Sequence, residues 1–271
     1  EMVNLAGATP VVVETTAESG YLLEPAQLRQ ALESNPQVKL LILCNPSNPT
    51  GGVYSKTALE GLCQVLRDYP HVHVLADEIY DQLVYDDDET KTAAELCPSI
   101  AAEPGMWQRT LIINGFSKAY AMTGFRLGYL AAPQVLARAC TTLQSQFTSC
   151  ASSVSQAAGV AALTQVEGPW LKEKVTELKT KRNLCLQRLA DMPHVTVHVP
   201  PQGAFYVLPD ISSYYEGDDV AFCRQLLEDQ KLALVPGSSF GAPGTVRLSY
   251  ATSFEELNLA MDKLAAFLQA Q

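Results

Sequence analysis

The sequence has little positive charge and no long apolar run. Its 271 residues include 19 lysines and arginines against 29 acidic residues, a formal net charge of −10 at pH 7. Such an acidic chain is a poor ligand for nucleic acid or for an anionic membrane surface. No apolar stretch approaches the roughly 18 residues that a helix needs to cross a bilayer. We therefore expect a soluble protein with neither nucleic acid nor membrane among its partners.

The sequence also lacks paired motifs that would form disulfides or bind a metal. Its seven cysteines are scattered and form no Cys-x-x-Cys pair, so we expect free thiols in a reducing compartment. The four histidines give one His-x-His pair, His71 and His73, on one face of an expected strand. No carboxylate or cysteine set accompanies this pair, and we predict no metal site.

What the sequence does contain is enough apolar residue for a substantial core, at 47% hydrophobic and 18% charged. Strand-like and helix-like segments alternate, which predicts an α/β fold with a mixed, mostly parallel sheet and flanking helices. We expect strands at residues 9–13, 38–44, 72–76, 109–114, 126–131, 195–199, 204–208, 232–235 and 245–250. We expect helices at residues 25–34, 56–69, 133–165, 169–190, 218–230 and 254–270. The later strands are shorter, which predicts a large domain at 1–170 and a small α+β domain at 171–271. The acidic run at residues 86–89 is expected to be a solvated loop.

One lysine and one arginine suggest a cofactor. Lys118 follows a turn of small residues, Gly115-Phe116-Ser117, and Arg126 comes eight residues later. A lysine held on a tight turn can form a Schiff base with a cofactor aldehyde, and the forked donors of an arginine can bind a phosphate. Pyridoxal phosphate carries both groups, so the pairing indicates that cofactor. Taken alone, Lys118 would be an ordinary solvated lysine.

Polar residues that suit the same cofactor follow two expected strands upstream. The loop at residues 45–52 lies at the carboxyl end of one strand, where open α/β sheets bind ligands. Asp77 ends the next strand, and its carboxylate could pair with a protonated pyridine nitrogen. Tyr80 and Asn48 could donate hydrogen bonds to the cofactor's phenolic oxygen. Each feature has a plainer alternative: a simple turn, a helix N-cap for Asp77 and a core-edge aromatic for Tyr80.

Taken together, these motifs resemble those of the class I and II aminotransferases, which are pyridoxal-phosphate enzymes of fold type I. The matching segments keep their order and spacing at residues 48–51, 77–80, 115–118, 126–128, 202–206, 235–241 and 246–253. The resemblance covers essentially the whole chain. It implies a transaminase that uses pyridoxal 5'-phosphate, acts on an amino acid and a 2-oxo acid, and forms a homodimer. It also implies a cytoplasmic enzyme, or one of the plastid stroma if the source is a plant or alga.

The resemblance assigns roles to the residues nearest the cofactor ring. Lys118 corresponds to the lysine that binds the cofactor and shuttles a proton. Asp77 corresponds to the partner of the pyridine nitrogen. Tyr80 and Asn48 correspond to the donors to the phenolic oxygen.

The resemblance also implies that two arginines bind anions. Arg126 corresponds to a phosphate ligand, and Arg247 to the arginine that grips the substrate's α-carboxylate together with Asn48. Many relatives have a phosphate-binding serine where this chain has Gly115, which leaves Ser117 as the neighbour of the phosphate. Residues 1–7 resemble an internal helix of the family, so we expect the amides that cradle the phosphate to lie outside this chain.

The resemblance is strongest to the aspartate aminotransferase branch of bacteria and plastids, at residues 114–130 and 143–153. Within it, bifunctional aspartate/prephenate aminotransferases of plants and algae are most similar. These enzymes aminate a keto acid, including prephenate, from glutamate or aspartate. A dicarboxylic substrate needs a second cation, which the sequence does not identify. A pyridoxal-phosphate lyase on the same fold and a truncated, non-catalytic chain remain alternatives.

Overall fold

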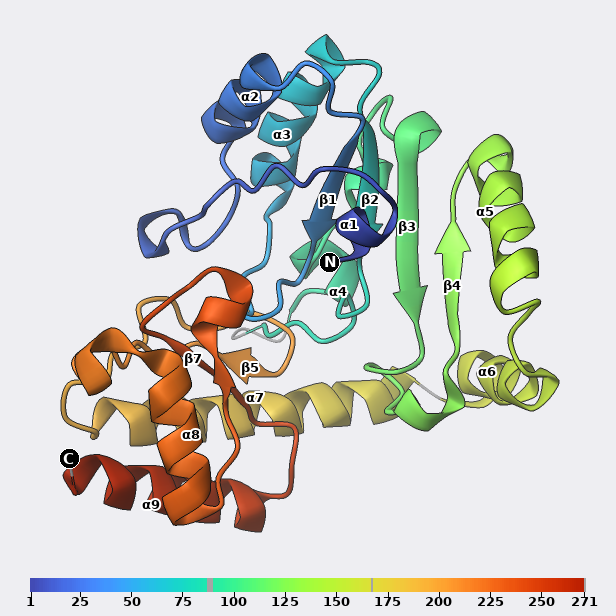
Figure 1. Cartoon of the computed structure of the whole chain (residues 1–271). Helices are drawn as coiled ribbons and strands as arrows, with labels where there is room; N and C mark the ends of the chain where they lie inside the picture. Colours follow the sequence, from blue (N-terminus) through green and yellow to red (C-terminus); the bar gives the residue numbers. More distant parts are fainter. Residues whose placement is uncertain (87–89, 167, 271) are drawn as a thin grey trace.

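The chain folds around two β-sheets of different size (Figure 1). The computed structural model describes residues 1–86, 90–166 and 168–270. The strands are β1 (Leu40–Cys44), β2 (His73–Asp77), β3 (Thr110–Gly115), β4 (Gly128–Ala131), β5 (Tyr206–Val207), β6 (Val235–Pro236) and β7 (Val246–Ser249). The helices are α1 (Met2–Leu5), α2 (Pro25–Ser34), α3 (Lys56–Asp68), α4 (Ala93–Leu96), α5 (Gln134–Phe147), α6 (Ser153–Gln165), α7 (Gly168–Ala190), α8 (Asp219–Gln230) and α9 (Phe254–Gln269).

The larger sheet is mixed and mostly parallel, as the sequence predicts. Its order is β1-β2-β3-β4, in which β1, β2 and β3 run parallel and β4 returns antiparallel to β3. Cys44 at the end of β1 pairs in register with Asp77 at the end of β2. The carboxyl ends of the three parallel strands therefore lie along one edge of the sheet, and Figure 1 shows this edge facing β5 and β7.

Helices α2 and α3 cover this sheet through one apolar core. Ser55 caps α3 by accepting a hydrogen bond from the amide of Ala58. Three leucines that recur on one face of α3 are at most 1% exposed and belong to the same buried cluster as Val74 of β2: Leu59, Leu62 and Leu66. A single helical face of this kind fixes the helix against the sheet.

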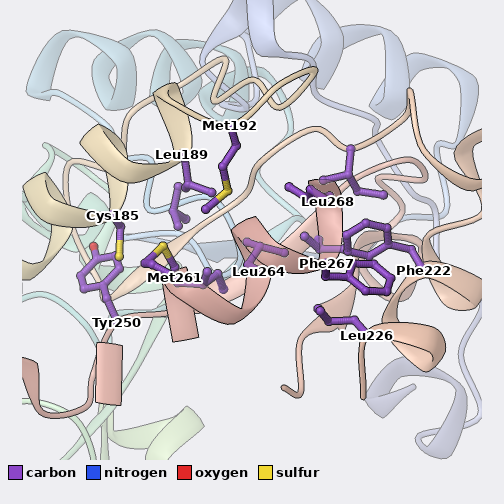
Figure 2. Packing of buried hydrophobic residues seen from close by; sticks show 14 of the residues in the cluster. Cys185, Leu189, Met192, Phe222, Leu226, Tyr250, Met261, Leu264, Phe267 and Leu268 are labelled. Atoms are coloured by element: carbon purple, nitrogen blue, oxygen red, sulfur yellow. The ribbon is translucent and has the colours of Figure 1, made fainter. Parts of the chain in front are cut away.

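The smaller sheet packs with α7, α8 and α9 around a second core. Its order is β5-β7-β6, with both pairings antiparallel. Figure 2 shows the core side chains that converge from the three helices. The rings of Phe222 on α8 and Phe267 on α9 are nearly perpendicular, with centroids 5.4 Å apart. Burying side chains of this size stabilises the fold by about 1.5–3 kcal/mol each.

Four expected elements differ in the structure. The expected strand at 232–235 is displaced to β6 at Val235–Pro236, and residues 232–234 are irregular backbone. The expected strand at 9–13 is irregular backbone, because it has no neighbouring strand to pair with; Val12 is 79% exposed. The expected strand at 195–199 is reduced to one bridge between Thr196 and Asp210. The expected helix at 133–165 is broken between α5 and α6, where Ser149 adopts a left-handed φ of 62°. The run of serine and threonine there favours turns over helix.

Two further expectations concern the acidic loop and the domain boundary. Residues 87–89 of the expected acidic loop lie outside the described residues. The boundary between a domain at 1–170 and one at 171–271 stays a prediction. Among the residues that the structure describes, no helix is both long and apolar enough to cross a membrane.

Candidate active site

The loop after β1 carries Asn48 and is held by its own backbone. The Ser47 amide donates to the Gly52 carbonyl over 2.8 Å, and the Gly51 amide donates to the Ser47 carbonyl over 2.9 Å. Gly51 has a left-handed φ of +70°, and a Cβ on it would lie 2.3 Å from the Cβ of Pro201. Only glycine fits this close approach. The loop therefore presents Asn48 from a fixed backbone.

Asp77 lies at the end of β2, one strand along the same edge. The Ile79 amide donates to its Oδ1 over 3.4 Å. Partial burial raises the pKa of the Asp77 carboxyl, and the hydrogen bond from Ile79 and the positive charge of Lys118 oppose that rise. The Asp77 carboxyl is thus half-buried, and it lies close enough to Lys118 for each charge to affect the pKa of the other.

Lys118 follows β3, the third strand of the edge. Backbone hydrogen bonds from Phe116 to Leu127 and from Ala121 to Lys118 tighten the turn around it. Burial lowers the pKa of the Lys118 amine, and the positive charges of Arg247 and Arg126 lower it further against the opposing effect of Asp77. A lowered pKa increases the fraction of neutral amine, the form that acts as a nucleophile or a base.

The turn before Lys118 explains why position 115 is glycine. A Cβ on Gly115 would lie 3.0 Å from both the Cα of Gly128 and the carbonyl oxygen of Leu127. The backbones of the paired strands β3 and β4 lie very close together here, so a larger residue at position 115 would push the two strands apart. Ser117 is partly buried beside Lys118, and within the described residues its hydroxyl has no hydrogen-bond partner.

Arg247 on β7 reaches the same edge from the smaller sheet. Its Nη1 donates to Oδ1 of Asn48 over 2.9 Å. Its guanidinium carbon lies 4.5 Å from the ring centroid of Tyr206 and 4.9 Å from that of Phe240. Its Nε is buried without a hydrogen-bond partner among the described residues. A partly buried guanidinium is costly without an anion, so its charge favours an anion nearby.

Arg126 is placed differently from the other candidates. It is exposed, has a left-handed φ of 52°, and donates from Nη1 to the Thr123 carbonyl over 2.9 Å. This backbone bond leaves most of its forked donors available. The effect of its charge on the pKa of Lys118 places it on the same side of the site.

Tyr80 is buried at the centre of the site, and it brings in a residue that the sequence analysis did not assign. Its hydroxyl lies 3.0 Å from the hydroxyl of Tyr206. The Nζ of Lys118 lies 5.6 Å from the Tyr80 ring centroid and 5.5 Å from that of Phe205. Burial raises the pKa of Tyr80 well above its ordinary value. Tyr80 therefore stays protonated, and its hydroxyl can donate a hydrogen bond.

The structure thus brings Asn48, Asp77, Tyr80, Lys118 and Arg247 to one edge of the larger sheet. The residues missed by sequence reasoning are Tyr206, Phe205 and Phe240. Their motifs at 202–206 and 235–241 are visible in the sequence, but the pattern gives no contact for them. No group of three or more His, Cys, Asp or Glu side chains within residues 1–86, 90–166 and 168–270 is arranged to hold a metal ion.

Comparison with known proteins shows the family of the chain. The family described as aminotransferase class I and II matches residues 1–264. The chain belongs to this aminotransferase family. An aspartate aminotransferase of Pinus pinaster is 44% identical over 275 residues, which cover 97% of this chain and 54% of the relative. A bifunctional aspartate aminotransferase and glutamate/aspartate-prephenate aminotransferase of Petunia hybrida is 41% identical over 97% of this chain and 55% of the relative.

A solved structure shows the same fold. The crystal structure of the aspartate aminotransferase from Rhizobium meliloti aligns with a TM-score of 0.87 at 39% identity, covering 99% of this chain and 67% of that one. The fold is therefore that of the fold-type I aminotransferases, as expected. The chain spans about half the length of the two plant relatives.

The residues present fit the cofactor of this family, pyridoxal phosphate. The lowered pKa of Lys118 suits an amine that must attack an aldehyde. The half-buried carboxylate of Asp77 suits a protonated ring nitrogen, and the protonated Tyr80 suits a phenolic oxygen. The aldehyde, the ring nitrogen and the phenolic oxygen of the cofactor therefore each have a complementary side chain among the described residues.

Proposed function

We propose that the full-length protein transfers an amino group from aspartate or glutamate to a 2-oxo acid, with 2-oxoglutarate and prephenate among the acceptors. The observation that carries this proposal is the partly buried guanidinium of Arg247 beside Asn48, at the edge that holds Lys118 and Asp77. A carboxylate placed there would pair with the arginine and leave the α-carbon of an amino acid near Lys118.

Lys118 is the base in this proposal. Its pKa is lowered chiefly by burial, which increases the fraction of neutral amine that can take the α-proton. The same amine would hold the cofactor between turnovers. Arg126 and Ser117, on either side of the turn, would bind the phosphate.

Asp77 and Tyr80 set the electronic state of the cofactor in this proposal. When bound, the cofactor supplies a protonated pyridine ring that accepts the electron pair released at the substrate's α-carbon. The Asp77 carboxylate would hold the proton on the ring nitrogen. Tyr80, whose pKa is raised by burial, would donate a hydrogen bond to the phenolic oxygen, and Asn48 would donate a second one.

The choice of substrates rests on the relatives. The two plant proteins at 44% and 41% identity are named for aspartate and for aspartate and prephenate transamination. Comparison of kcat/KM for aspartate with 2-oxoglutarate and for glutamate with prephenate tests this part. A rate with prephenate below one hundredth of that with 2-oxoglutarate would remove prephenate from the proposal.

Two observations separate transamination from the alternatives. The absorbance spectrum of the full-length protein should show bound cofactor, and adding aspartate alone should shift it in a single turnover. A lyase would continue to turn over without any 2-oxo acid, whereas an aminotransferase would stop until one is added. A chain that binds no cofactor would be the non-catalytic alternative. The Lys118→Ala variant is the control for the spectrum.

The homodimer and the compartment belong to the same proposal. Helix α5 has no buried residue, and its apolar side chains Val135, Leu143 and Phe147 are 80%, 62% and 84% exposed. A surface of this kind supports burial in an assembly. All seven cysteines are free thiols, which supports a reducing compartment, cytoplasmic or plastid.

A further inference from the structure

We propose that Tyr206 is a positioning residue that joins the two halves of this site: its hydroxyl orients that of Tyr80, and its ring holds the guanidinium of Arg247. The inference rests on the proposed function and deepens it. In this inference Tyr206 contacts neither the cofactor nor the substrate. It acts through Tyr80 and Arg247.

The hydroxyl of Tyr206 determines what the hydroxyl of Tyr80 can do. The two oxygens are 3.0 Å apart, and the two residues are 6% and 3% exposed. Each phenol has one proton to donate. If Tyr80 gives its proton to the cofactor's phenolic oxygen, the bond between the tyrosines must run from Tyr206 to Tyr80. With this direction, the hydroxyl of Tyr206 donates to Tyr80 and the hydroxyl of Tyr80 donates to the cofactor, so both hydroxyl groups act as donors.

The ring of Tyr206 faces the guanidinium of Arg247. Its centroid lies 4.5 Å from the guanidinium carbon, within the range of a cation–π interaction. The ring centroid of Phe240 lies 4.9 Å from the same guanidinium carbon, and Oδ1 of Asn48 accepts a hydrogen bond from Nη1 of Arg247. These three contacts fix the plane of the guanidinium and leave the buried Nε without a partner among the described residues. An arginine fixed in this way is ready for a carboxylate before one arrives.

The backbone explains how one residue reaches both partners. Tyr206 of β5 pairs with Ser249 of β7 in an antiparallel register. Arg247 lies two residues before Ser249, so its side chain leaves the same face as Ser249 and is the diagonal neighbour of Tyr206. The isolated bridge between Val84 and Gly203 brings the segment that contains Tyr80 against the start of β5. Tyr206 therefore lies where the two sheets meet.

A purely structural role is the alternative, because Tyr206 also belongs to a small buried cluster with Tyr80, Leu83 and Ala204. Two variants separate the roles. Tyr206→Phe keeps the ring and removes the hydroxyl, whereas Tyr206→Leu removes both. Tyr214→Phe is the matched control, since Tyr214 is a buried tyrosine whose hydroxyl donates to the Pro193 carbonyl over 2.6 Å, in the core around α8.

The experiment uses the full-length protein and three readouts: the thermal melt, the pH titration of the bound cofactor's absorbance, and calorimetric binding of maleate to cofactor-free protein. Tyr206→Phe should raise the spectrophotometric pKa of the cofactor by about half a unit or more, because a weaker donor at its phenolic oxygen favours the protonated form. Its maleate Kd should stay within about twofold of the wild-type value. Tyr206→Leu should show the same spectral change and about a fivefold or greater rise in the maleate Kd.

Two results would overturn the inference. One is a Tyr206→Phe variant that melts earlier, as Tyr214→Phe should, but titrates like the wild type. The other is a Tyr206→Leu variant that binds maleate as tightly as the wild type. Wild-type protein that shows no cofactor band would refute the proposed function instead. The maleate measurement needs no cofactor and would still decide whether Tyr206 positions Arg247.

Discussion

Arg247 donates a hydrogen bond from Nη1 to Oδ1 of Asn48, a residue 199 positions away in the sequence, over 2.9 Å. The bond joins the smaller sheet to the loop after β1. It uses one end of the guanidinium and leaves the buried Nε unpaired within the described part of the chain. The positive charge of this guanidinium favours a carboxylate beside it.

Arg247→Lys should raise KM for both the amino donor and the keto acceptor by about tenfold or more, because lysine keeps the charge but loses the bidentate geometry. The absorbance of the bound cofactor should not change. Steady-state kinetics and a thermal melt check this. Arg188→Lys is the control, since Arg188 pairs with exposed Asp262 away from the site. Normal KM with a lower Tm would assign Arg247 to structure instead.

Asp77→Ala should slow the chemical step by orders of magnitude while cofactor affinity changes far less. The carboxylate is the group that would keep a proton on the pyridine nitrogen, and alanine cannot. Asp77→Glu should retain part of the rate. The measurement is exchange of the substrate's α-proton with deuterium. An unchanged exchange rate in Asp77→Ala would contradict the role assigned to this carboxylate.

The glycine at position 51 should be essential to the fold of the Asn48 loop. Gly51→Ala should lower the free energy of unfolding by about 2–4 kcal/mol, from left-handed strain and the clash with Pro201. Gly105→Ala is the control, because Gly105 has a φ of +81° but no atom within 4 Å of an added Cβ. It should cost only about 1 kcal/mol. Equal losses in urea unfolding would show that the close approach does not matter.

Glu78 should make the protein less stable as the pH rises. Burial raises the pKa of its carboxyl from 4.5 to about 7, against the opposing hydrogen bond from Ser99. The folded state then holds the proton more tightly than the unfolded state. The contribution of Glu78 to the free energy of unfolding is therefore greatest below about pH 4.5 and falls as the pH rises to about 7.

Glu78→Gln removes this titration and keeps an oxygen that can accept from Ser99. It should leave stability nearly unchanged at pH 5. At pH 8 it should raise the free energy of unfolding, by up to about 3 kcal/mol. Urea unfolding of both proteins at the two pH values measures the difference. A variant that is equally or less stable than the wild type at pH 8 would contradict the assignment.

Local sequence patterns predict the larger sheet and the residues at its edge. Apolar runs predict β1, β2 and β3. Asp77 is predictable because it directly follows such a run, and Lys118 because it follows the turn of small residues after one. Alternation also predicts the strand of Arg247. The contact of Arg247 with Tyr206 and Asn48 is not predictable in this way, since it depends on how the two sheets meet. The break at Ser149 falls in a short run of serine and threonine between two longer helix-favouring segments, and so short a run does not by itself predict that a helix ends.

The central claim is that Lys118 is the residue that holds the cofactor. Borohydride reduction of the full-length protein loaded with pyridoxal phosphate, followed by peptide mapping, tests it most directly. The account predicts a pyridoxyl group on Lys118 and its loss in Lys118→Ala, together with loss of turnover by orders of magnitude. A stoichiometric pyridoxyl group on any other lysine would contradict it.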